Sequence, residues 1–382
     1  MNTAMNTCDR ERLARAALSR IGEPGSPRLC SLVAEMGAQP LYENLLAARD
    51  PDGVLTDGAE RLASADPARE LEQAQRLGIR FVIPSDPEWP SQLDDLASCP
   101  PLQDRGGVPI GLWAKGPLLL SELESSVAVV GSRSATTYGE RVANEIAAVA
   151  AGAGTSVISG AAFGIDQAAH RGALSREGPT VAVLACGADR VYPAAHASLI
   201  QHIAATGLVV SEAALGCSPH RIRFLARNRL IAALSRGTVV VEAAVRSGAL
   251  NTVNWAGRLN RSVMGVPGPV TSATSGGVHQ QIRLGAATLV TKGQEVLEMV
   301  GAAGEHLVED PRGPETSRDH LSTRHRQVLD AVPVSSGAAS DSVARTAGLG
   351  VLEVRTALAY LEQAGLVEAS DDGWRLAALA HT

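Results

Sequence analysis

The chain has 382 residues, of which 45% are hydrophobic and 19% charged, and its formal net charge is −6. This length exceeds what a single hydrophobic core usually serves, so two or three domains are expected. The sequence gives no support for a signal peptide, a membrane span of about 18 apolar residues, a disulfide framework or a paired-cysteine zinc site. We therefore expect a cytoplasmic, globular protein that binds neither a metal nor a membrane.

Residues 1–80 are expected to form a small helical domain. Apolar positions recur every three or four residues in segments such as RERLARAALSRI, and Gly/Pro breaks such as GEPGSP separate these segments. A proline-rich stretch with two short apolar runs follows, up to about residue 125. We interpret it as a connector that carries edge strands.

The pattern changes at Val127, where apolar strands begin to alternate with amphipathic helices. The strands are VAVVG, SVISG, TVAVLACG, LVVSEA, TVVVEA and SVMGVPG. This alternation predicts an α/β fold with a parallel sheet covered on both faces. Residues 81–300 are thus expected to form a Rossmann-like domain, with ligands binding beyond the carboxyl ends of the strands.

The C-terminal part differs in composition. Residues 301–318 are polar and contain Gly and Pro, which is typical of a linker. Residues 319–382 predict three helices and a short hairpin, an order that suggests a winged-helix-like domain. This segment has five basic and eight acidic residues and no Lys, so we expect it to face a protein rather than phosphate.

Positive charge is concentrated in the central block. Residues 126–295 carry 15 basic and 8 acidic side chains, and 14 of the 15 are Arg. Arg offers a planar set of donors suited to phosphate. This distribution is compatible with an anionic ligand, and equally with solvated Arg–Glu pairs.

The stretch SPHRIRFLARNRLIAALS contains the densest group of these arginines. On a helix, Arg223 and Arg227 share one row, while Phe224 and Asn228 form the adjacent row. Guanidinium groups beside one aromatic ring and one amide suit a nucleic-acid single strand. The chain has only three Phe, four Tyr and four Trp, so an extended aromatic platform is not expected.

Other candidates have structural interpretations as well. Gly131-Ser132-Arg133 follows a strand and favours an anion site over an ordinary turn. Asp166 and His170 could form an acid–base pair, although a hydrogen bond within the helix is the stronger expectation. Glu242 could be catalytic or could bind a backbone N–H of the next loop. The P-loop and dinucleotide fingerprints are both missing.

The motifs VVGSR, SG.A.GID..AH..AL, F..RNR.IA.LS and VVEA..RSGAL.T occur here in the order in which they occur in the DNA-processing protein A family (DprA, also called Smf). The resemblance spans roughly residues 80–292. It implies a cytoplasmic, dimeric, single-stranded DNA binder that loads the RecA recombinase, without a cofactor and without catalysis. The DNA-binding residues that it implies here are Gly131, Ser132, Arg133, Ser159, Gly160, Phe224, Arg227, Asn228 and Arg229.

Two other functions compete with this one. A nucleotide-binding or nucleotide-cleaving Rossmann-fold enzyme, related to the nucleoside monophosphate phosphoribohydrolases, would use Glu242 and Arg133. Such enzymes show paired glycines before the Glu, which the stretch from Leu234 to Thr238 lacks. An interaction scaffold would act through its acidic ends. The Arg cluster and the ordered motifs favour the DNA mediator.

Overall fold

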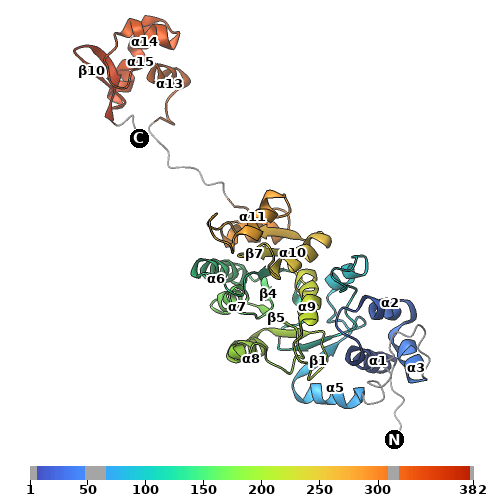
Figure 1. Ribbon diagram of the computed structural model, residues 1–382. Coiled ribbons are helices and arrows are strands. Elements are labelled where there is room, and N and C mark those ends of the chain that lie inside the picture. Colours follow the sequence, from blue (N-terminus) through green and yellow to red (C-terminus); the bar gives the residue numbers. More distant parts are fainter. Residues whose placement is uncertain (1–6, 48–65, 309–317, 379–382) are drawn as a thin grey trace. The chain divides into compact units, whose positions relative to one another are not determined.

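The computed structural model describes residues 7–47, 66–308 and 318–378. The chain divides into two compact units, residues 1–308 and 309–382, and each is described by itself (Figure 1). Half of the linker expected at 301–318, residues 309–317, lies outside the described residues. The boundary expected at residue 80 falls inside a strand, Ile79–Val82, of the first unit.

A mostly parallel sheet forms the centre of the first unit, which confirms the predicted α/β Rossmann-like fold. In the described residues it has the order β1-β2-β6-β5-β4-β3-β7-β8-β9, and β3 to β9 are parallel. The strands are β1 (Ile79–Val82), β2 (Leu112–Lys115), β3 (Ser126–Val130), β4 (Ser156–Ser159), β5 (Thr180–Leu184), β6 (Leu208–Ser211), β7 (Gly237–Val240), β8 (Ser262–Gly265) and β9 (Thr288–Leu289). After β3 the chain continues to β4 on one side of β3, and it later returns to form β7 on the other side of β3. The gap between β3 and β7 is therefore the topological switch point.

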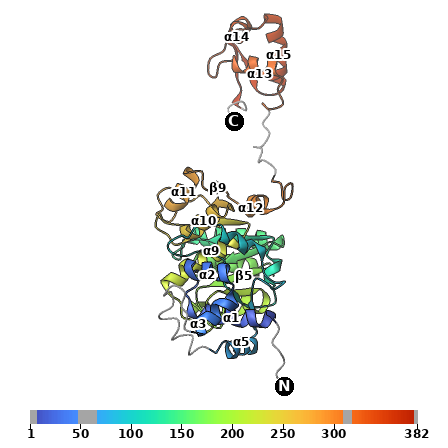
Figure 2. The same cartoon turned by 90° about the vertical axis from the view of Figure 1, so that its right-hand side faces the viewer.

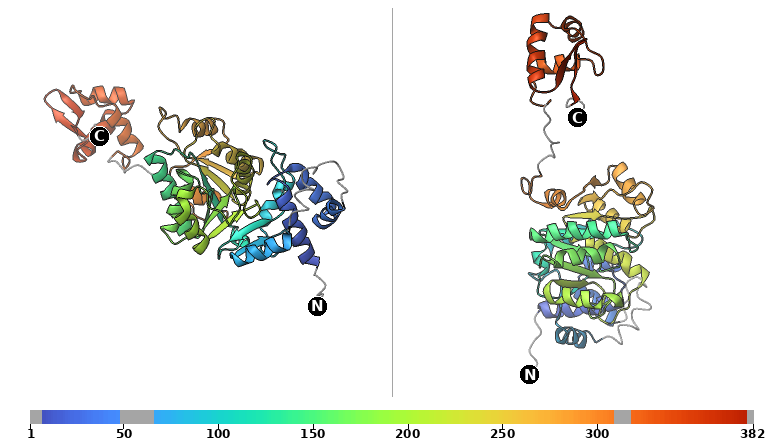
Figure 3. Two further views of the ribbon diagram at one scale, coloured as in Figure 1. Left: turned by 60° about the horizontal axis from the view of Figure 1, so that its bottom comes forward. Right: turned by 90° about the vertical axis from the view of Figure 1, so that its left-hand side faces the viewer.

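Helices cover both faces of this sheet (Figures 1 and 3). Alternate residues of β3 point to opposite faces: Val127 and Val129 pack with α6, α7 and α12, whereas Ala128 and Val130 belong to the core that contains α9 and α10. The helices are α6 (Thr137–Gly152), α7 (Ile165–Leu174), α8 (Ala197–Thr206), α9 (Arg221–Ala233), α10 (Ala249–Arg258), α11 (Gly276–Arg283) and α12 (Gly293–Val300). Burial on both faces explains why the strand sequences are continuously apolar.

The N-terminal helices belong to the same compact unit. Their own core is formed by residues such as Leu18, Leu29 and Leu41, but Ala16 of the first helix packs with β1 and β2. In Figure 2 these helices lie on the side of the first unit that is turned toward the viewer. They are α1 (Thr7–Ile21), α2 (Pro27–Met36), α3 (Ala38–Leu46) and α5 (Pro67–Arg76), and two 3₁₀ helices, η1 (Ser91–Ala97) and η2 (Leu120–Glu122), follow β1 and β2.

The second unit contains three helices followed by a hairpin, in the order that the sequence predicts. The helices are α13 (Thr323–Asp330), α14 (Ser340–Ala347) and α15 (Val351–Gln363), and the hairpin consists of β10 (Val367–Ser370) and β11 (Gly373–Leu376). Val328, Leu358 and Leu361 are among the residues that form its own hydrophobic core. Its classification as a winged-helix domain remains a prediction.

Candidate nucleic-acid interface

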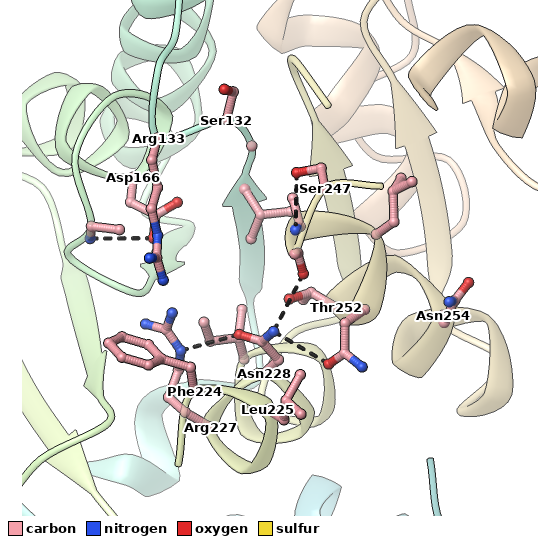
Figure 4. A pocket seen from close by; sticks show the side chains of 18 of the residues that line it. Ser132, Arg133, Asp166, Phe224, Leu225, Arg227, Asn228, Ser247, Thr252 and Asn254 are labelled. Atoms are coloured by element: carbon pink, nitrogen blue, oxygen red, sulfur yellow. Dashed lines mark hydrogen bonds between the residues drawn. The ribbon is translucent and has the colours of Figure 1, made fainter. Parts of the chain in front are cut away.

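A pocket of about 990 Å³ opens at the carboxyl edge of the sheet, where β3 and β7 separate (Figure 4). Its walls come from the loops after β3 and β7 and from helices α9 and α10. This is the position at which open α/β sheets bind ligands, because two loops diverge there and leave a crevice. The predicted residues Gly131, Ser132, Arg133, Phe224, Arg227 and Asn228 all line it.

The loop after β3 forms one wall and depends on close backbone packing. A Cβ atom on Gly131 would lie 2.5 Å from Ile165 and 2.9 Å from the carbonyl oxygen of Glu242, so this position requires glycine. The N–H of Ser132 donates to that same carbonyl at 2.6 Å. These contacts hold the loop so that the exposed Arg133 extends over the ring of Phe224, with its Cζ 4.9 Å from the centroid.

Glu242 has a structural role next to this loop. Its buried carboxylate accepts hydrogen bonds from the N–H of Thr136 at 2.9 Å, from the hydroxyl of Thr136 at 2.7 Å and from the hydroxyl of Thr274 at 3.2 Å. Thr136 is the N-cap of α6, where a negative charge is favourable. Glu242 therefore binds a backbone N–H, but one of the loop after β3 and not of the next loop.

Asp166 and His170 do not act as a pair. Asp166 accepts from the N–H groups of Gly160 and Ala162, and the Nδ1 atom of His170 contacts the hydroxyl of Thr180 at 2.8 Å. Among the hydrogen bonds of the described residues, none joins the two side chains, so the expected bond within the helix is not seen either. Burial raises the pKa of Asp166 and lowers that of His170 to about 3.

Arg227 lies under the pocket as a buried cation. Its Nη1 atom donates to the carbonyl oxygens of Gly160 at 2.7 Å and Val183 at 2.9 Å. A Cβ atom on Gly160 would overlap the guanidinium group, which explains the glycine there. Burial, opposed by the attraction of Asp166, lowers the pKa of Arg227 from its ordinary value. Beside it, Asn228 donates to the side-chain oxygen of Asn251 at 3.2 Å.

Three predicted contact residues, Ser159, Gly160 and Arg229, are not among the residues that line the pocket. Arg229 is 0% exposed, and its guanidinium forms two hydrogen bonds, of 2.6 and 2.7 Å, with the carboxylate of Glu212. Ser159 is also buried, and its hydroxyl donates to the carbonyl oxygen of Val129 at 2.7 Å. Both side chains are therefore engaged inside the protein, and a contact of Ser159 or Arg229 with DNA stays a prediction. Arg223 is likewise engaged, by Glu23.

The structure adds two cations to the site residues named from the sequence. Arg221 and Arg246 are exposed and line the pocket, from the start of α9 and from the loop after β7. Arg246 is the only cation in the stretch VEAAVRSG, which begins at the end of an apolar strand, so the sequence carried a signal for it. No group of three or more potential metal ligands occurs among the described residues.

Comparison with known proteins decides the family. Residues 80–301 match the family described as DNA recombination-mediator protein A. The chain belongs to this family. A DprA-type DNA processing protein of Mycobacterium tuberculosis (strain ATCC 25618 / H37Rv) is 43% identical over 366 residues, which cover 95% of this chain and 94% of the relative. The DNA processing protein DprA of Streptococcus pneumoniae (strain ATCC BAA-255 / R6) is 37% identical over 252 residues, covering 65% and 87%.

A solved structure supports the fold. The X-ray structure of DprA from Streptococcus pneumoniae matches with a TM-score of 0.64 and 31% identity, covering 76% of this chain and 98% of the other. Membership places the chain among DNA recombination mediators and not among the Rossmann-fold hydrolases considered above. No helix in the described residues is long and apolar enough to cross a membrane.

Proposed function

We propose that the pocket between β3 and β7 binds single-stranded DNA. The observation that carries this proposal is that three exposed cations, Arg133, Arg221 and Arg246, line one concave site. The ring of Phe224 and the amide of Asn228 line the same site, and Figure 4 shows them with Arg133. The cations suit phosphates, the ring suits a base face, and the amide suits a base edge. Membership of a DNA-processing family supports the same ligand.

The shape of the site favours a single strand over a duplex. Phe224 is half-buried in a pocket wall, so a base must leave its stack to reach the ring. An unpaired base does so at little cost, whereas a duplex must first be unpaired and unstacked. Gly131, Ser132 and Gly160 contribute by keeping the backbone close to Arg133 and Arg227.

We further propose that the protein acts in the cytoplasm as a recombination mediator, as a homodimer that loads the RecA recombinase onto the bound strand. This function needs no cofactor, because binding and handing over a strand involve no covalent chemistry. The family to which the chain belongs supports the mediator role. Sedimentation of the chain tests the dimer, and the rate of RecA filament growth on a pre-coated single strand tests the loading.

A salt titration tests the DNA site itself. With three phosphates neutralised by the exposed arginines, the slope of log affinity against log salt is expected to be roughly −2, at about 0.7 per contact. Arg133→Ala, Arg221→Ala and Arg246→Ala should each flatten it by about 0.7. Arg176→Ala is the matched control, since Arg176 is exposed and follows α7 at the opposite edge of the sheet. Equal affinity for a duplex, or unchanged slopes in all three variants, would refute the proposal.

A further inference from the structure

Three aromatic side chains gather at the carboxyl edge of the sheet. Phe163 lies in the loop after β4, Tyr192 in the loop after β5, and Phe224 in α9, which follows β6. Because β4, β5 and β6 are adjacent parallel strands, the segments that follow them emerge side by side at one edge, about 5 Å apart from strand to strand. We call these three residues the aromatic row.

The rings of the row are open to solvent and held in place. Phe163 is 46% exposed and Tyr192 is 45% exposed, so both rings are accessible to a ligand. Tyr192 packs near Phe224, with ring centroids 5.8 Å apart. Phe163 packs edge-on against His196 at 4.5 Å, and the Nδ1 atom of His196 contacts the carbonyl oxygen of Ala161.

The row also continues the pocket. Phe224 and Ala162 line the pocket, whereas Tyr192 and Phe163, the next residue after Ala162, lie beyond its lining. Exposed Arg190 lies two residues before Tyr192 in the same loop and forms no ion pair among the described residues. Aromatic rings with neighbouring unpaired cations are the combination that binds successive nucleotides of a single strand.

We propose that the aromatic row stacks bases that lie beyond the pocket, so that the strand runs from Phe224 in the pocket wall past Tyr192 and on to Phe163. This inference rests on the proposed function and extends it from a one-base pocket to a path. It differs from the expectation that an extended aromatic platform is absent, because three rings on the segments after consecutive strands share this edge.

Phe163→Trp in the full chain tests the path directly, with a readout other than affinity. Stacking of a base on the introduced indole should quench its fluorescence beyond the change seen in the parent chain, whose residues Trp113 and Trp255 are fully buried. Oligothymidylates of about four and about twelve nucleotides, within the range of known site sizes, serve as probes. At saturation, the longer strand should quench the indole fluorescence, and the shorter strand should quench it less.

Affinity measurements complete the test. Phe163→Leu and Tyr192→Leu should each weaken binding of the longer strand by about fivefold, the lower limit of a lost stacking contact, without changing the salt slope. Phe163→Leu should leave the shorter strand unaffected. Tyr360→Leu, which removes a ring of 46% exposure from the second unit, is the control, and thermal melts establish that each variant is folded.

The outcomes separate this inference from the proposed function. If Arg133→Ala weakens binding while Phe163→Leu changes nothing and the Phe163→Trp variant is not quenched, the path is refuted and the pocket stands. If the parent chain binds neither strand, the proposed function fails and the path fails with it. If the shorter and the longer strand quench the fluorescence of the Phe163→Trp variant to the same extent, Phe163 belongs to the pocket itself. That result would refute an extended path.

Discussion

Replacing Arg229 by Ala should destabilise the protein and leave its interaction with phosphate unchanged. The guanidinium forms hydrogen bonds of 2.6 and 2.7 Å with Glu212 and is 0% exposed, while the Glu212 side chain is 7% exposed. Removal of one partner from a buried ion pair costs about 3–5 kcal/mol, since the other charge stays buried without compensation. At about 2.1 cal/mol/K per residue, a unit of roughly 300 residues should melt about 5–8 °C lower.

Calorimetry and the salt titration measure the two effects separately. The Arg229→Ala variant should show the lower melting temperature and, while folded, a salt slope equal to that of the parent chain. Arg133→Ala should show the opposite, because its side chain is exposed and reaches the pocket: an unchanged melting temperature and a slope flattened by about 0.7. Arg229→Met combined with Glu212→Gln removes both charges and should recover much of the lost stability.

A single result would refute this reasoning. If Arg229→Ala flattens the salt slope by about 0.7 and melts with the parent chain, Arg229 contacts a phosphate. The buried ion pair with Glu212 would then be absent in solution. The original assignment of Arg229 to the DNA site would be restored.

Three further predictions follow from the buried groups and the two units. Burial holds the pKa of His170 at about 3 in the folded chain, against about 6.5 when unfolded, so stability should fall on acidification below about pH 6.5, by up to about 1.4 kcal/mol per pH unit. His170→Asn should remove this contribution to the pH dependence of the unfolding free energy, which urea melts at several pH values measure. Glu242→Gln should lower the free energy of unfolding by about 1–2 kcal/mol, because it weakens the hydrogen bonds to Thr136. Its DNA affinity should stay largely intact, and no nucleotide turnover should be found. A chain ending at residue 308 should keep its single-strand affinity in the same titration, because six basic and eight acidic residues in 318–378 make the second unit a poor phosphate binder.

The sheet and its ligand edge could be predicted from the sequence because both depend on local patterns. Continuous apolar runs ending in Gly mark buried parallel strands, and the loops that follow such strands meet at one edge. This reasoning placed Gly131, Ser132 and Arg133 at the pocket, where the structure has them. The same rule applied to the loop after β7 indicates Arg246, whose position in VEAAVRSG was available from the sequence.

The orientation of the α9 side chains could not be predicted in the same way. A helical row is a reliable guide when one face of a helix meets solvent, but residues 226–233 of α9 are buried on all sides. Which guanidinium reaches the pocket is decided by partners distant in the sequence: Glu212 for Arg229, and the carbonyl groups of Gly160 and Val183 for Arg227. Such partners follow from tertiary packing alone.

The arginines of α9 fall into two groups. Arg221 and Arg227 line the pocket, whereas Arg223 and Arg229 form ion pairs away from it. The second group explains the place of the N-terminal helices. Arg223 binds Glu23, and the Glu212 carboxylate that holds Arg229 also accepts a hydrogen bond from the N–H of Gly25. Both contacts join α9 to the loop between α1 and α2. Because Phe224 lies on α9 between Arg223 and Arg229, the first forty residues help to orient its ring at the pocket. The N-terminal segment, which belongs to the first compact unit, thus supports the helix that carries the ring of the proposed DNA site.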